Sequence, residues 1–207
     1  MNVAVFGARG RIGRKVVEIA EARGHAVWQI DREWQQNALE KVDVVIDFST
    51  PNATQSVCEF CKLHHCALVS GVTGRDEGQL QLIDELSERV PVVCKANFSQ
   101  GIEMMRELLE TVAKKLAEWD CEVIEIHHRN KMDAPSGTAK ELAATIAKQR
   151  SFRNVTVHAL RAGSNNGTHT VIFATNGESL TLTHQAENRD IFARGAVLEA
   201  ERLKFLA

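Results

Sequence analysis

A short apolar run at residues 3–6 is followed by three glycines, Gly7, Gly10 and Gly13, and then by a helical pattern. This order of strand, glycine-rich turn and helix constrains the fold more than any other feature of the sequence. The glycines permit a tight turn and a close approach of the backbone to a pyrophosphate, which rests on the positive end of the helix. The start of the chain therefore predicts a dinucleotide-binding unit.

The next predicted strand, residues 26–30, ends at Asp31, and Arg32 follows it directly. A carboxylate at this position can bind the adenosine ribose hydroxyls of NAD, whereas a guanidinium can hold the additional phosphate of NADP. We therefore expect NADH, NADPH or both as the cofactor. The predicted contacts of this part are Gly7, Ala8, Arg9, Gly10, Arg11, Ile12, Asp31 and Arg32.

Strands and helices continue to alternate with short loops up to residue 99. Apolar runs at 43–48, 67–70 and 91–95 predict strands, and periodic segments at 52–65 and 76–89 predict helices. This alternation is typical of a Rossmann-like, doubly wound parallel sheet, in which cofactors bind at the carboxyl ends of the strands. Further cofactor contacts are therefore expected in two later loops, at Gly71, Val72, Thr73, Ala96, Asn97, Phe98 and Ser99.

The second half has a different character. A long amphipathic helix at 100–119 precedes the predicted strands, and Asn-Gly pairs at Asn166-Gly167 and Asn176-Gly177 are typical of hairpin turns. A final helix could pack back onto the nucleotide-binding part. The sequence thus predicts an α/β protein with a second, α+β domain whose mixed sheet is mostly antiparallel. The nucleotide-binding domain is expected at 1–99 and 187–207, and the second domain at 100–186. The expected segments here are strands at 123–126, 155–160, 168–174 and 179–184 and helices at 139–148 and 193–206.

Two adjacent histidines, His127 and His128, lie between the predicted strand at 123–126 and the predicted helix at 139–148, and Lys131 follows them. Loops of this kind often carry chemistry on a rigid scaffold. The helix begins near a Ser-Gly-Thr sequence whose backbone N–H groups suit a carboxylate or a phosphate. The combination predicts a site where an anion undergoes proton transfer, with the helix start formed by Ser136, Gly137 and Thr138.

Charge and cysteine content exclude several classes of function. A net charge of −2 gives no electrostatic basis for binding nucleic acid or an anionic membrane. No apolar run is long enough to span a bilayer, and the N-terminal sequence lacks the pattern of a signal peptide, so a cytoplasmic protein is expected. Five cysteines argue against a disulfide framework.

Histidine and cysteine positions are not expected to bind a metal. Cys58 and Cys61 fall on one face of a predicted helix, where cysteine behaves as a small apolar residue, and no second ligand pair completes a zinc site. Three further histidines on the later strands are expected at half-exposed sheet positions rather than as ligands: His158, His169 and His184.

The sequence around the two histidines resembles that of the dihydrodipicolinate reductases. The most specific part of this resemblance is Glu125-x-His127-His128-x-x-Lys131-x-Asp133-Ala-Pro-Ser-Gly-Thr-Ala139, and the resemblance extends over nearly the whole chain. Supporting segments are Gly7 to Gly13, Asp47-Phe48-Ser49, the loops at 71–74 and 96–99, Arg161-Ala-Gly163, Gly167-Thr-His169 and the segment at 192–196.

The resemblance implies hydride transfer from NADH or NADPH to a cyclic dicarboxylate imine in lysine and diaminopimelate biosynthesis. By motif position, His127 matches the general acid–base and Lys131 the second proton donor, while His128, Gly137 and Thr138 match residues that hold the substrate carboxylates. The family also implies a homotetramer that is joined through the sheets of the second domain. Transfer of a hydride leaves charge to be quenched by a proton, and histidine has a suitable pKa range for that step.

Two departures leave the choice of cofactor open. Val72 stands where the family commonly has a threonine, and the segment from Asp31 to Asp43 is very short. Two alternatives also remain: another NAD(P)-dependent dehydrogenase of an amino acid or a dicarboxylate, and a nucleotide-binding regulator without catalysis. The first would not need the whole motif, and the second would predict the loss of His127 or Lys131, both of which are present.

Overall fold

The computed structural model describes residues 1–30, 41–149 and 155–204. Asp31 and Arg32, two predicted cofactor contacts, lie outside the described residues. Contacts divide the chain into two compact units, Met1–Phe98 with Asp190–Ala207, and Ser99–Arg189. The sequence predicts independently folding domains at 1–99 with 187–207 and at 100–186. These limits stay a prediction.

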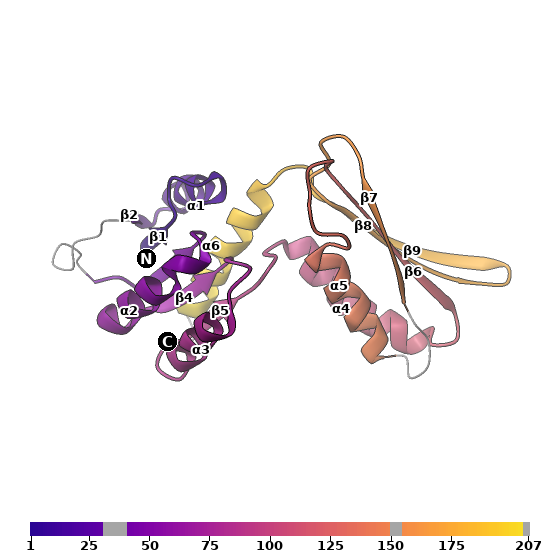
Figure 1. The fold of residues 1–207 in the computed structure, drawn as a ribbon, viewed down its shortest axis with the longest axis horizontal. Coiled ribbons are helices and arrows are strands. Elements are labelled where there is room, and N and C mark those ends of the chain that lie inside the picture. Colours follow the sequence, from indigo (N-terminus) through magenta and orange to yellow (C-terminus); the bar gives the residue numbers. More distant parts are fainter. Residues whose placement is uncertain (31–40, 150–154, 205–207) are drawn as a thin grey trace. The chain divides into compact units, whose positions relative to one another are not determined.

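The first unit contains a parallel sheet of five strands within the described residues, in the order β2-β1-β3-β4-β5 (Figure 1). This observation confirms the predicted doubly wound fold. The reversal of strand order beside β1 is the arrangement at which such sheets bind ligands. The elements are β1 (Asn2–Phe6), α1 (Arg11–Ala22), β2 (Ala26–Ile30), β3 (Val44–Asp47), a short 3-10 helix η1 (Pro51–Ala53), α2 (Thr54–His64), β4 (Ala67–Ser70), α3 (Glu77–Ser87), β5 (Val92–Cys94) and α6 (Asp190–Lys204).

Alternating side chains of the strands build two cores, one on each face of this sheet. Val3 and Val5 pack with α1 and α6 on one face, and Ala4 and Phe6 pack with α2 and α3 on the other. A strand that is buried on both faces explains why these segments read as continuous apolar runs. The last helix, α6, packs on α1, β3 and β4, so the end of the chain completes the first unit.

The second unit consists of one four-stranded sheet with helices on one face. Residues of α4 and α5 form a core with the inward side chains of the sheet, such as Val123, Val171 and Phe173. Strands β6 and β7 are parallel, and the pairs β6–β8 and β8–β9 are antiparallel, which confirms the predicted mixed sheet. The elements are α4 (Gln100–Lys115), β6 (Asp120–His127), α5 (Gly137–Lys148), β7 (Thr156–Arg161), β8 (Thr168–Thr175) and β9 (Glu178–Gln185), with the strand order β7-β6-β8-β9.

One of the two predicted hairpins is wrong. The turn at Asn176-Gly177 joins β8 to β9 as expected, but the turn at Asn166-Gly167 joins β7 to β8, and β6 lies between them. Instead of closing a hairpin, Asn165 accepts a hydrogen bond from the Gly167 backbone N–H at 2.7 Å, which forms a local turn at the start of β8. The Asn-Gly pair correctly predicts a turn, but it does not predict which strands pair with one another.

Candidate active site

The predicted cofactor loops of the first unit meet at Phe48, the residue after β3. A Cβ added at Gly7 would lie 2.7 Å from the Phe48 backbone oxygen, and one added at Gly71 would lie 2.2 Å from its ring. The ring also packs edge-to-face on Phe98, with centroids 5.9 Å apart. Phe48 therefore lies beside the loops after β1, β4 and β5. No sequence pattern assigns a role to this residue.

The turn between β1 and α1 is tight and depends on glycine at two positions. Gly7 has a φ of +72°, and a Cβ added at Gly13 would lie 2.1 Å from the Gly7 backbone oxygen. Within the described residues no side chain caps the start of α1, whose N-cap is Gly10. Arg9, Gly10 and Arg11 are exposed, whereas Ala8 is buried. Open backbone N–H groups at a helix start and nearby arginines fit a dinucleotide phosphate.

A buried ion pair fixes the loop after β4. The Arg75 guanidinium donates to Asp47 at 3.3 Å, to the Ser70 hydroxyl at 2.7 Å and to the Val72 backbone oxygen at 3.0 Å. Asp47 and Ser70 are both buried at the carboxyl ends of β3 and β4. These contacts hold the backbone of Val72, a predicted cofactor contact, next to exposed Thr73.

The loop after β5 is fixed at its C-terminal end. Phe98 is buried in the core on the α6 face of the sheet, and Ser99 caps α4 by accepting a hydrogen bond from the Ile102 backbone N–H. Ala96 remains exposed and Asn97 half-buried. The two residues before Phe98 are therefore the accessible part of this predicted contact loop.

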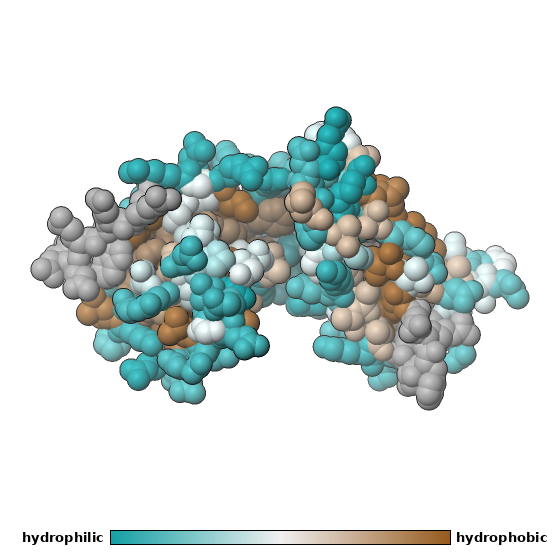
Figure 2. Space-filling view, in the orientation of Figure 1, coloured by the Kyte–Doolittle hydropathy of each residue, from teal (hydrophilic) through white to brown (hydrophobic). Residues whose placement is uncertain are grey.

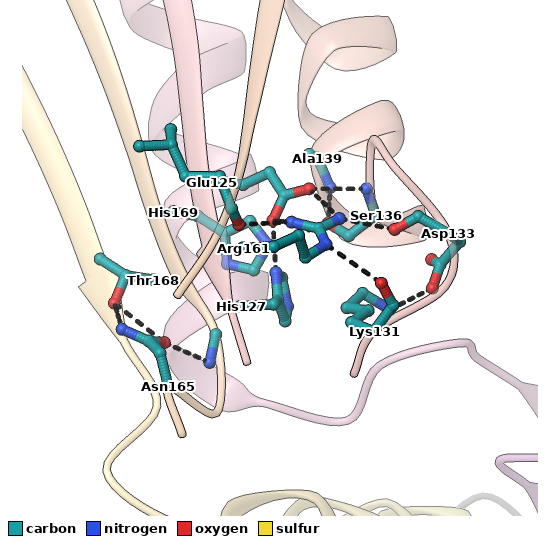
Figure 3. Close-up of polar contacts among 12 residues, drawn as sticks. Glu125, His127, Lys131, Asp133, Ser136, Ala139, Arg161, Asn165, Thr168 and His169 are labelled. Atoms are coloured by element: carbon teal, nitrogen blue, oxygen red, sulfur yellow. Dashed lines mark hydrogen bonds and ion pairs between the residues drawn. The ribbon is translucent and has the colours of Figure 1, made fainter. Parts of the chain in front are cut away.

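In the second unit, a buried polar cluster forms where β6 ends (Figure 3). Glu125 and His127 face the helix-covered side of the sheet, and the Glu125 carboxylate binds Nδ1 of His127. Arg161, at the end of β7, donates to both oxygens of Glu125 at 2.8 and 2.9 Å. The alternation of side chains along a strand explains why residues two apart share a face. His128 lies beyond the strand, half-buried, with Nε2 3.3 Å from an Arg189 nitrogen.

The pKa values of this cluster have opposing causes. Burial lowers the pKa of His127, the Glu125 carboxylate acts against this, and the charges of Lys131 and Arg161 add to the lowering. Burial alone would raise the pKa of Glu125, but hydrogen bonds from Arg161, His127 and Ser136 lower it overall. Glu125 is therefore an ionised acceptor at neutral pH.

Lys131 and the start of α5 form the cationic side of the site. The Lys131 ammonium pairs with Asp133 at 2.6 Å, and this pairing is the main cause of the lowered pKa of Asp133. Gly137 is exposed and Thr138 half-buried at the first residues of α5. Ser136 is engaged within the chain: its N–H donates to Glu125 and its hydroxyl caps α5. Its predicted contact with substrate stays a prediction.

The expectation of a half-exposed His169 is wrong. His169 is 3 % exposed, its Nε2 lies 3.3 Å from the Ser136 hydroxyl, and its ring packs edge-to-face on His127. His158 is exposed and His184 half-buried. Along β8, the odd positions from 169 to 173 are buried on the side of the sheet that α4 and α5 cover, and even positions lie on the other face. The alternation of side chains does not show which of the two faces is buried. Burial, together with the charge of His127, lowers the pKa of His169 to about 4.

Acid is therefore expected to destabilise the protein through His169. In the unfolded chain the imidazole takes up a proton near pH 6.5, whereas in the folded chain it does so only near pH 4. The stabilisation is thus complete above pH 6.5 and falls as the pH drops towards 4, by at most about 3 kcal/mol. Denaturant unfolding between pH 7 and 4 should show a smaller loss for His169→Gln than for wild type. His158→Gln, at an exposed position, is the control, and equal losses in all three proteins would contradict the role of His169.

Within the described residues, no group of three or more histidine, cysteine, aspartate or glutamate side chains is arranged to hold a metal ion. In the same part of the chain, no helix has the length and apolar character needed to cross a membrane.

Comparison with known proteins identifies the family of this chain. Models of the N-terminus and C-terminus of dihydrodipicolinate reductase match residues 1–98 and 101–206. A 4-hydroxy-tetrahydrodipicolinate reductase of Thermosipho africanus is 37% identical over 97% of this chain and 90% of its own length. One from Stenotrophomonas maltophilia is also 37% identical, over 99% of this chain and 92% of its own.

Solved structures share the fold. The dipicolinate-bound dihydrodipicolinate reductase of Paenisporosarcina sp. TG-14 superposes with a TM-score of 0.80 at 23% identity, covering 99% of this chain and 95% of that one. GenD2 from gentamicin A biosynthesis, solved with NAD, gives a TM-score of 0.63 at 14% identity, covering 99% of this chain and 85% of its own. On the two family matches and the near-full-length relatives, the chain belongs to the dihydrodipicolinate reductase family.

Proposed function

We propose that this protein reduces 4-hydroxy-tetrahydrodipicolinate to tetrahydrodipicolinate, with NADH or NADPH as the hydride donor, in lysine and diaminopimelate biosynthesis. The observation that carries the proposal is the cluster at the end of β6, where His127 is bound to Glu125 and lies within the electrostatic influence of Lys131, near the start of α5. It is supported by the reductase relatives, which match nearly the whole chain.

The nucleotide is assigned to the first unit. Its phosphates would be held at the start of α1, by Gly7, Ala8, Arg9, Gly10, Arg11 and Ile12. Its nicotinamide end would be lined by the loops after β4 and β5, at Gly71, Val72, Thr73, Ala96, Asn97, Phe98 and Ser99. When bound, the reduced nicotinamide supplies a hydride, that is, a hydrogen nucleus with two electrons. Asp31 and Arg32 remain proposed adenosine contacts outside the described residues.

The substrate is assigned to the second unit. Lys131, His128, Gly137 and Thr138 would bind the carboxylates of a small cyclic dicarboxylate, because a cation and backbone N–H groups at a helix start both favour an anion. His127 would deliver the proton that balances the arriving hydride. Lys131, the second proton donor, would protonate the hydroxyl group of the substrate, which leaves as water while the ring loses one proton, so that the net addition is one hydride and one proton. Lys131 must then exchange its Asp133 partner for the substrate.

An enzyme assay tests the proposal directly. Oxidation of NADH and of NADPH should be followed by absorbance with freshly generated substrate, and the ratio of the two rates gives the cofactor preference. Oxidation that depends on substrate is the expected result. If the purified protein binds the nucleotides but oxidises neither, the function is another reduction or a regulatory one.

We also propose a cytoplasmic homotetramer. Side chains on the face of the second sheet that the helices leave uncovered include Ile124, Ile126, Leu160 and Ile172, and Leu160 is 44% exposed. Hydrophobic surface is visible over this unit in Figure 2. A second copy of the chain is the proposed partner of this face, and sedimentation should give four times the chain mass.

The proposed cytoplasmic location is supported by the cysteines. All five are free thiols, which suits a reducing compartment.

A further inference from the structure

The Glu125 carboxylate has all of its hydrogen-bonding capacity engaged inside the second unit. It is completely buried, although it is charged. One oxygen accepts from the Ser136 N–H at 3.0 Å and from Arg161 at 2.8 Å; the other accepts from Arg161 at 2.9 Å and from Nδ1 of His127. A buried carboxylate with four donors has one fixed orientation, and so does every group that is bonded to it.

This arrangement determines where His127 carries its proton. An ionised carboxylate can only accept, so Nδ1 of His127 must be the N–H donor. The neutral imidazole then has its lone pair on Nε2, and the charged imidazolium has its second proton there. Within the described residues no group is hydrogen-bonded to Nε2, and a Cβ added at Gly167 would lie 2.9 Å from it.

Arg161 connects Glu125 and His127 to the loop between β6 and α5, which carries Lys131 and is called the Lys131 loop here. Besides its two bonds to Glu125, its guanidinium donates to the backbone oxygens of Lys131 at 3.3 Å and of Asp133 at 2.5 Å. The register of the parallel strands pairs Arg161 with His127, which brings it to this cluster. Arg161 thus neutralises the buried carboxylate and holds the Lys131 loop against the same group that orients His127.

We propose that Glu125 and Arg161 are positioning residues of the reaction: Glu125 fixes His127 with its exchangeable proton on Nε2, and Arg161 holds Glu125 and the Lys131 loop in one unit. The inference rests on the proposed function for its catalytic consequence but on the structure alone for the proton position. If the Glu125–Arg161 salt bridge served folding only, removal of the Glu125 carboxylate would lower stability but leave kcat and the pH profile of the folded enzyme unchanged.

The variant Glu125→Gln separates these roles, because the amide keeps the size of the side chain. Its NH₂ group would donate to Nδ1 and so place the single proton of neutral His127 on Nε2, and the loss of the carboxylate would lower the pKa of His127 further. We expect kcat to fall about 10²-fold or more, with the KM for substrate changed less than threefold. The limb on which kcat/KM decreases with rising pH should move to lower pH by about one unit or more.

A second Arg–Glu–His cluster in the chain provides the matched control. In the first unit, Glu201 accepts from Arg23 twice at 2.7 Å and lies 2.8 Å from Nε2 of His25. Glu201→Gln removes the same kind of carboxylate from the same kind of partners, and we expect unchanged kcat and an unchanged pH profile. An equal shift of the profile in both variants would overturn the proposal.

Nitrogen NMR of the His127 imidazole in the wild-type protein without ligands provides a test that needs neither activity nor a folded variant. The expected result is the tautomer with Nδ1 protonated at pH 8. Finding Nε2 protonated would overturn the proposal. If the wild type fails to reduce the substrate while Nδ1 is protonated, the proposed function fails and the assignment of the proton stands. If Glu125→Gln keeps wild-type kcat and pH profile in an active enzyme, the catalytic role of Glu125 fails.

Discussion

The substitution His127→Gln should reduce kcat by about 10²–10⁴-fold, the usual contribution of a positioned general acid. Glutamine can donate a hydrogen bond but cannot release a proton, so the charge left by hydride arrival would have to be quenched by water. The side chain of His127 is only about a tenth exposed, so water is a poor substitute for the imidazole at this position.

The measurement is steady-state oxidation of NADH or NADPH with and without substrate, for wild type, His127→Gln and His158→Gln. His158 pairs with Glu122 on the exposed face of the sheet and serves as the control histidine. For wild type, kcat/KM should decrease as the pH rises through the pKa of His127, which lies below the ordinary value of 6.5. A His127→Gln enzyme with wild-type kcat would remove His127 from the reaction.

The substitution Gly195→Ala should destabilise the protein strongly, even though alanine favours a helix. Gly195 lies buried within α6, and a Cβ added there would be 1.7 Å from the backbone oxygen of Phe98. Backbone cannot yield as a flexible side chain can, so α6 or the loop after β5 must move. We expect a loss of about 3 kcal/mol or more in the free energy of unfolding, as for severe overpacking.

The matched control is Gly78→Ala in α3, where the added Cβ would meet only the Asp76 carboxylate at 3.5 Å. There, alanine should stabilise the protein by about 0.5–1 kcal/mol through helix propensity. Denaturant unfolding measures both effects, and nucleotide titration should show weaker binding by Gly195→Ala because Phe98 belongs to a proposed cofactor loop. Equal stability of the two variants would show that α6 can withdraw from Phe98 at little cost.

Sequence patterns gave the parallel sheet because each signal for it is local. A strand that is buried on both faces is a continuous apolar run, as in β1 and β3, and a glycine turn before a helix needs only neighbouring residues. The signal that would have revealed Glu125 was also local, because it lies two residues before His127 on the same strand. Alternation of side chains along a strand places both on one face, but it does not show which face is buried.

The sequence alone determined the alternation of strands and helices, the glycine turn, and the loop that carries His127, His128 and Lys131. Only the tertiary structure decided that β6 lies between β7 and β8, which corrected the hairpin expected at Asn166-Gly167. That same pairing brings Arg161 to Glu125, although 36 positions separate them in the chain. Local patterns arise from the period of a single element, whereas the pairing of strands depends on long-range packing, and the environment of His127 is formed by the latter.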